Sequence, residues 1–145
     1  MTFARSTTTV FVSLVCLAAS YSLAAAETVT FTANLDGLSE VPPTASTGKG
    51  TLAARFDTVT KQLSWDVSYS SLSGDATAAH FHGPALAGAN SGVVVQIAQF
   101  KTPFTGTAPL TDAQFAELSA GKWYVNIHTA KYPTGEIRGQ VVKDK

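Results

Sequence analysis

The chain contains three histidines, and they fall in two short segments. His80 and His82 lie in the segment AHFHGP, and His128 lies in the segment YVNIHT. Imidazoles at positions i and i+2 of a strand project from the same face, with Cα atoms about 6–7 Å apart. They can bind one metal ion, and a third histidine from a neighbouring strand would complete three nitrogen ligands. Such a set, without sulfur, favours Zn²⁺ or Cu²⁺ over Cu⁺.

Two other interpretations of these histidines stay open. His80 and His82 would also suit a structural role, in which they hydrogen-bond to the local backbone and shape the turn after them. Imidazole changes its charge near neutral pH, so proton-linked ligand binding is a third interpretation. An HxH pair alone is a weak signal for a metal site, and a third histidine on a matching face strengthens it.

The dominant hydrophobic period of the chain is two, which predicts strands with one buried and one solvated face. The predicted strands span residues 27–37, 50–57, 61–70, 77–82, 92–99, 122–128 and 136–143. One short helix is predicted at 111–120, because Thr111 and Gln114 form a capping-box pattern and Gly121 can end a helix. The sequence therefore predicts an all-β fold, an antiparallel Greek-key β-sandwich with one short helix.

Side-chain alternation places all three histidines away from the predicted core. In strand 77–82 the large apolar residue is Phe81, so His80 and His82 point to the opposite face. In strand 122–128 every second residue is apolar and belongs to the core. The residues that point outward from that strand are Tyr124, Asn126 and His128. We therefore expect the histidines on the outer face of the sandwich.

The next strand contributes charged residues to the same face. If strands 122–128 and 136–143 form a hairpin, Glu136 lies opposite His128 and Arg138 lies near Asn126. A carboxylate beside a histidine commonly fixes the imidazole tautomer in metal sites. A register slip of two residues would put Arg138 in the place of Glu136. An ion pair of Arg138 with a glutamate is the simpler alternative for the arginine.

The first residues have the layout of a secretory signal peptide. Arg5 precedes an apolar run at 10–19, and small residues at 24–26 offer a cleavage site. We expect a signal peptide at 1–26 and a single domain at 27–145, exported to the periplasm or outside the cell. Since the apolar run is shorter than a bilayer span, we expect no membrane span after cleavage.

The domain at 27–145 offers little other reactive chemistry. The one cysteine of the chain, Cys16, lies in the predicted signal peptide. The whole chain has 10 acidic and 10 basic residues, of which only Arg5 lies in the predicted signal peptide, and no basic run suggests nucleic-acid binding. No serine lies in a nucleophile-elbow pattern. We therefore expect a binding module rather than a turnover enzyme.

Three long segments resemble the CHRD domain, a family named for its repeats in chordin and also found as single-domain exported bacterial proteins. They are LDGLSEVPP at 35–43, AAHFHGPALAGANSGVVV at 78–95 and AGKWYVNIHTAKYPTGEIRGQV at 120–141. The resemblance implies an immunoglobulin-like or superoxide-dismutase-like sandwich. It carries over these motif positions: Glu40, Pro42, His80, His82, Gly83, Pro84, Asn126, His128, Gly135, Glu136, Arg138 and Gly139. Chordin is an extracellular antagonist of growth factors, but a fold alone supplies no activity.

The leading hypothesis is an exported module that binds Cu²⁺ or Zn²⁺ through His80, His82 and His128. The residues expected to orient these ligands are Tyr124, Asn126, Glu136, Arg138 and Glu40. One alternative is an extracellular adhesion or interaction domain with its own protein partner, in which the same residues form a structural network. A second alternative is a mononuclear copper oxidoreductase acting on superoxide. Three histidines are too few for the dinuclear site of copper–zinc superoxide dismutases.

Overall fold

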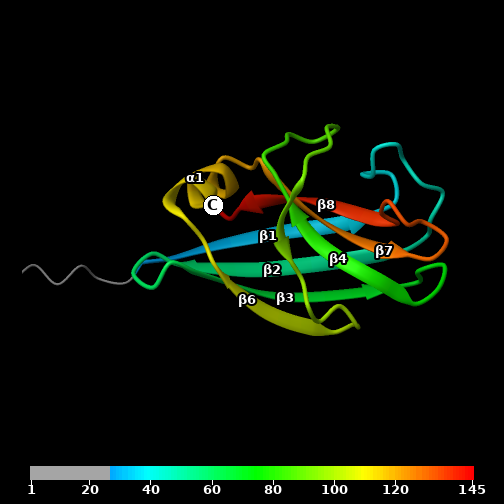
Figure 1. Ribbon diagram of the computed structural model, residues 1–145, viewed down its shortest axis with the longest axis horizontal. Coiled ribbons are helices and arrows are strands. Elements are labelled where there is room, and N and C mark those ends of the chain that lie inside the picture. Colours follow the sequence, from blue (N-terminus) through cyan, green and yellow to red (C-terminus); the bar gives the residue numbers. More distant parts are fainter. Residues whose placement is uncertain (1–26) are drawn as a thin grey trace, which may run out of the picture.

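The computed structural model describes residues 27–145, and the predicted signal peptide at 1–26 lies outside this range. The described chain folds into eight strands and one helix (Figure 1). In order along the chain they are β1 Thr28–Asp36, β2 Lys49–Asp57, β3 Gln62–Ser70, β4 Ala76–His82, β5 Val93–Gln96, β6 Phe104–Pro109, α1 Asp112–Ser119, β7 Trp123–Thr129 and β8 Ile137–Lys143. The all-β prediction with one short helix is confirmed.

The eight strands form one nearly closed antiparallel sheet in the order β5-β4-β7-β8-β1-β2-β3-β6. Strands β1, β2 and β3 follow each other as hairpins, and β8 returns to pair with β1, as in a Greek key. The two halves of the sheet face each other across the core. There the ring of Trp65 on β3 lies 5.1 Å from the ring of Phe81 on β4. The sandwich prediction therefore holds, with its sheet curled almost into a barrel.

Strand β6 is absent from the strands predicted by sequence periodicity. Its sequence, FTGTAP, contains Gly106 and Pro109, which both weaken a strand signal. The glycine has a packing reason, since a Cβ at residue 106 would stand 2.5 Å from Cζ2 of Trp65. The proline lies at the end of an edge strand, where a missing N–H is tolerated. Only the pairing of β6 with β3 makes this segment a strand.

Helix α1 closes one end of the sandwich, and its ends agree with the sequence prediction. Thr111 is the N-cap, and it exchanges both capping-box hydrogen bonds with Gln114. Gly121 follows the helix with a φ of 68°, the left-handed conformation expected of a helix-ending glycine. The ring of Phe115 stacks on Phe56 of β2 with centroids 4.1 Å apart, which anchors the helix on the sheet.

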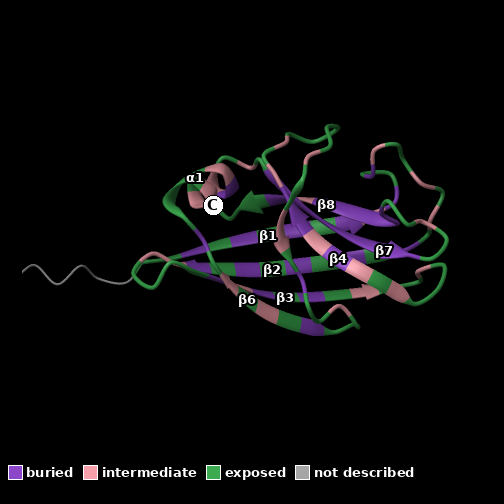
Figure 2. Ribbon diagram, viewed as in Figure 1, coloured by how far each residue is buried: buried purple, intermediate pink, exposed green. Residues whose placement is uncertain are grey.

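The outer side of β7 is covered, which corrects the expectation of an open outer face. Every residue of β7 is buried, those on the non-core side included (Figure 2). Two loops cover it, 37–48 between β1 and β2 and 83–92 between β4 and β5. Asn90 joins the loops through a 2.9 Å bond from its amide nitrogen to the carbonyl of Val41. The polar side of β7 is therefore an interior and not a surface.

None of the helices in the described residues is long and apolar enough to cross a lipid bilayer.

Candidate metal centre

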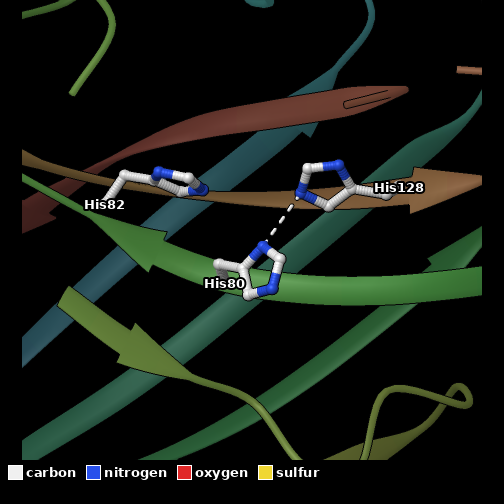
Figure 3. Close-up of side chains that lie close together, drawn as sticks. All are labelled: His80, His82 and His128. Carbon is white, nitrogen blue, oxygen red and sulfur yellow. Dashed lines mark hydrogen bonds between the residues drawn. The ribbon is translucent and has the colours of Figure 1, made fainter. Parts of the chain in front are cut away.

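Adjacent strands bring the three histidines into one cluster. In the antiparallel register of β4 and β7, His80 lies opposite Asn126 and His128 lies opposite Ala78. One ring nitrogen of each histidine lies within 4.8 Å of the other two, and the rings gather beside the paired strands (Figure 3). The shortest separation is 3.0 Å, between Nδ1 of His80 and Nε2 of His128. The group is thus able to hold a metal ion.

Backbone carbonyls fix the tautomer of two of the rings. Nδ1 of His82 lies 3.0 Å from the carbonyl oxygen of Ser91, and Nδ1 of His128 lies 3.0 Å from that of Pro133. A carbonyl oxygen only accepts hydrogen bonds, so each Nδ1 must donate its hydrogen. In the neutral ring, Nε2 then carries a lone pair. Both of these nitrogens face the interior of the cluster.

The amide oxygen of Asn126 lies between the two rings. Its Oδ1 atom is 3.1 Å from Nε2 of His82 and 3.0 Å from Nε2 of His128. The amide nitrogen faces the other way, towards Glu40 and Gly135. Asn126 therefore adds a third electron-rich atom to the space that the two imidazole lone pairs already face.

Burial keeps the histidines neutral. Burial lowers the pKa of His80, and the nearby His128 and His82 lower it further. Burial also lowers the pKa of His82 and of His128, and the hydrogen bonds to the carbonyls of Ser91 and Pro133 oppose this only in part. Neutral imidazole is the form that binds metal ions. The site is therefore in its ligating protonation state at neutral pH.

Tyr124 and Arg138 build the wall beside His82. The Tyr124 ring is parallel to the His82 ring with centroids 4.7 Å apart, and the Arg138 guanidinium carbon lies 3.4 Å from the Tyr124 centroid. The guanidinium donates hydrogen bonds to Asn90 and to the carbonyl of Ala89, at 3.0 and 2.8 Å. Arg138 thus ties loop 83–92 to β8, and this loop supplies the carbonyl that orients His82.

Glu136 has the backbone position that the predicted hairpin gives it, but its carboxylate does not contact His128. Asn126 pairs with Arg138, and the backbone nitrogen of Glu136 donates to Ile127 at 2.8 Å, as expected of the hairpin. However, it is the Pro133 carbonyl that lies against Nδ1 of His128. The side-chain partners of the Glu136 carboxylate are Ser46, Ser73 and Thr129. Its carboxylate therefore joins the loops around the site.

Glu40 reaches the site from loop 37–48, behind Asn126. The residue is 5% exposed, and its buried Oε1 atom has no hydrogen-bond partner among the described residues. Burial raises the pKa of Glu40 to about 7, although the charge of Arg138 and the amide of Asn126 act to lower it. Glu40 therefore contacts the Asn126 amide, and Asn126 in turn contacts the histidines.

The sequence analysis missed the carbonyl groups that orient the rings. Ser91 and Pro133 act through backbone oxygen atoms, which every residue type carries, so residue type gives no signal for them. The one signal for such a contact was that Pro133 follows His128 by five residues, in the loop of the predicted hairpin.

The model of the CHRD domain family matches residues 31–141, which is most of the chain. The chain belongs to the CHRD domain family. The resemblance of its motifs to this family is thereby confirmed. No match was found among curated proteins or among solved structures. All three histidines of this CHRD domain, together with Glu40, Asn126, Glu136 and Arg138, lie within the matched residues.

Proposed function

We propose that this CHRD domain binds one divalent metal ion, Cu²⁺ or Zn²⁺, through His80, His82 and His128. The observation that carries the proposal is the convergence of lone pairs in a buried space. Nε2 of His82 and Nε2 of His128 both face Oδ1 of Asn126 at hydrogen-bond distance, and their hydrogens are committed to carbonyls on the opposite sides of the rings. Acceptors that face one another repel, and a cation between them removes the repulsion.

The third nitrogen comes from His80, which is only half-buried. In the protein without metal, Nδ1 of His80 can donate a hydrogen bond to Nε2 of His128. A metal ion at Nδ1 of His80 would require this hydrogen to lie on Nε2 instead, and a side-chain hydrogen bond with Gln96 favours the protonated ring. His80 is therefore the proposed ligand nearest to solvent.

The donor types support a divalent ion of borderline softness. Imidazole nitrogen suits Zn²⁺ and Cu²⁺, whereas Cu⁺ prefers thiolate or thioether sulfur. Residues 27–145 contain neither cysteine nor methionine. We propose that the protein handles metal ions in the periplasm or outside the cell, since residues 1–26 are a predicted signal peptide. N-terminal sequencing of the protein recovered from outside the cytoplasm tests the export.

Metal analysis of the protein purified without a histidine tag tests the binding. We expect about one Cu²⁺ or Zn²⁺ per chain. We also expect a higher melting temperature in the presence of metal, because an ion that binds only the folded state stabilises it. Both effects should disappear in His80→Ala/His82→Ala. The control is Thr77→Ala, which alters an exposed residue of the same strand.

A structural network of histidines gives a different result. In that case His82→Ala would lower the melting temperature by the same amount with and without metal, and the wild type would hold no stoichiometric metal. This pattern would overturn the proposed function.

A further inference from the structure

Asn126 is placed so that its side chain can do more than orient the histidines. We infer that Oδ1 of Asn126 is a fourth ligand of the metal ion, so that the site offers three nitrogens and one oxygen. This inference rests on the proposed function and concerns which ion the site prefers.

A residue that only orients a metal-bound histidine bonds to the ring nitrogen that faces away from the metal. In His82 and His128 that nitrogen is Nδ1, and the carbonyls of Ser91 and Pro133 already occupy it. Asn126 contacts Nε2 of both rings instead. It therefore lies on the same side of the rings as the ion.

The spacing of the donor atoms agrees with a shared ion. Ligands bound tetrahedrally at 2.0–2.1 Å are separated from one another by about 3.3 Å. Oδ1 of Asn126 lies 3.1 Å from the His82 nitrogen and 3.0 Å from the His128 nitrogen, and the His80 and His128 nitrogens are 3.0 Å apart. Three of the separations between the four donor atoms are thus already close to those of a coordinated set.

Glu40 determines which atom of the amide faces the ion. The Asn126 Nδ2 atom lies 2.7 Å from the place that a Cβ on Gly135 would take, and the Glu40 carboxylate occupies that same place. With the amide reversed, its oxygen would face a carboxylate in a buried space, where two acceptors repel. Glu40 is therefore a positioning residue, which directs the amide nitrogen towards itself and the oxygen towards the histidines.

The oxygen donor gives the site more hard-ligand character, in the sense of hard and soft metal ligands. Carboxylate and carbonyl oxygens suit hard and borderline divalent ions, and a fourth donor of this kind adds little for Cu⁺. Asn126 thus raises the preference of the site for Zn²⁺ and Cu²⁺ over Cu⁺.

The test compares wild-type protein with Asn126→Ala and Asn126→Asp, using Asn34→Ala on the exposed face of β1 as the matched control. We expect Asn126→Ala to lower Zn²⁺ affinity by at least about tenfold and to change the Cu²⁺ hyperfine coupling in electron paramagnetic resonance. Asn126→Asp keeps an oxygen donor and should retain Zn²⁺ affinity. Cu⁺ affinity should change by less than about threefold in either variant.

A measurement on the wild type covers the case in which Asn126→Ala does not fold. Addition of Zn²⁺ should shift the side-chain NH₂ resonances of Asn126 in a ¹⁵N–¹H spectrum and leave those of Asn34 in place. Unchanged Asn126 resonances in a protein that binds Zn²⁺ through its histidines would overturn the inference and leave the proposed function standing. A wild type that binds no metal would overturn both.

Discussion

The carboxylate of Glu40 lies in the space that a side chain on Gly135 would occupy. Gly135 has a φ of 132°, a backbone conformation that residues with a Cβ rarely adopt. The two residues are far apart in the sequence, one in the loop after β1 and the other just before β8. Their contact closes the space behind Asn126, so the absence of a side chain at 135 is a condition for the geometry of the site.

Substitution of this glycine should therefore disturb both stability and metal binding. Gly135→Ala places a Cβ against Glu40 and Asn126 and strains the backbone, and we expect it to lower the free energy of unfolding by about 2–4 kcal/mol. Urea denaturation measures this loss. Gly74→Ala is the control, because a Cβ there has no neighbouring atom within 4 Å. Equal stabilities of the two variants would show that the contact with Glu40 is not tight.

Glu40 should make folding less favourable as the pH rises. Its pKa is about 7 in the folded protein, above the ordinary value of 4.5. Below pH 4.5 both states hold the proton; between 4.5 and 7 the unfolded state releases it first, so the stability contributed by this group is lost as pH rises. We expect the free energy of unfolding of Glu40→Gln, relative to that of the wild type, to rise by about 2–3 kcal/mol between pH 4 and pH 8.

Urea denaturation of both proteins at the two pH values, in the presence of a chelator, measures this difference. The comparison with the variant is needed because the lowered pKa values of the three histidines act in the opposite direction. Their stability contribution is present above pH 6.5 and is lost on acidification. A difference between wild type and Glu40→Gln that does not change with pH would contradict a raised Glu40 pKa.

Glu136 should behave in the opposite way to Glu40. Burial alone would raise its pKa, but hydrogen bonds from Ser46, Ser73 and Thr129 outweigh burial and hold the pKa below 4.5. Its contribution to stability is therefore present above pH 4.5 and is lost as the pH falls through the folded pKa. We expect Glu136→Gln to lower the free energy of unfolding by about 1–3 kcal/mol at pH 7, since the amide has one acceptor oxygen fewer and a hydroxyl such as that of the buried Thr129 then lacks an acceptor.

Thermal or urea unfolding at pH 7 measures this loss, with Asp75→Asn as the control at an exposed carboxylate. The deficit of Glu136→Gln should become smaller on acidification. A deficit that grows as the pH falls would show that the Glu136 carboxylate is not the acceptor that joins these loops.

Local signals in the sequence determined the elements that carry the site. The capping box of Thr111 and Gln114 marked the start of α1, and alternation with Phe81 put His80 and His82 on one face of β4. The sequence also offered the hairpin register that pairs Asn126 with Arg138, with a slip of two residues as the alternative, and the structure has the first of the two. These features depend on neighbours in the chain or on a single pair of strands.

The tertiary structure alone decided what surrounds the histidines. Loops 37–48 and 83–92 fold over β7, and this turns its polar face into an interior that no periodicity could reveal. The carbonyls of Ser91 and Pro133, which fix the tautomers of His82 and His128, are backbone atoms without a residue-type signal. The sequence by itself determined which side chains share a face. The packing of distant loops decided which of their atoms point inward, because burial and hydrogen-bond direction depend on contacts between segments far apart in the chain.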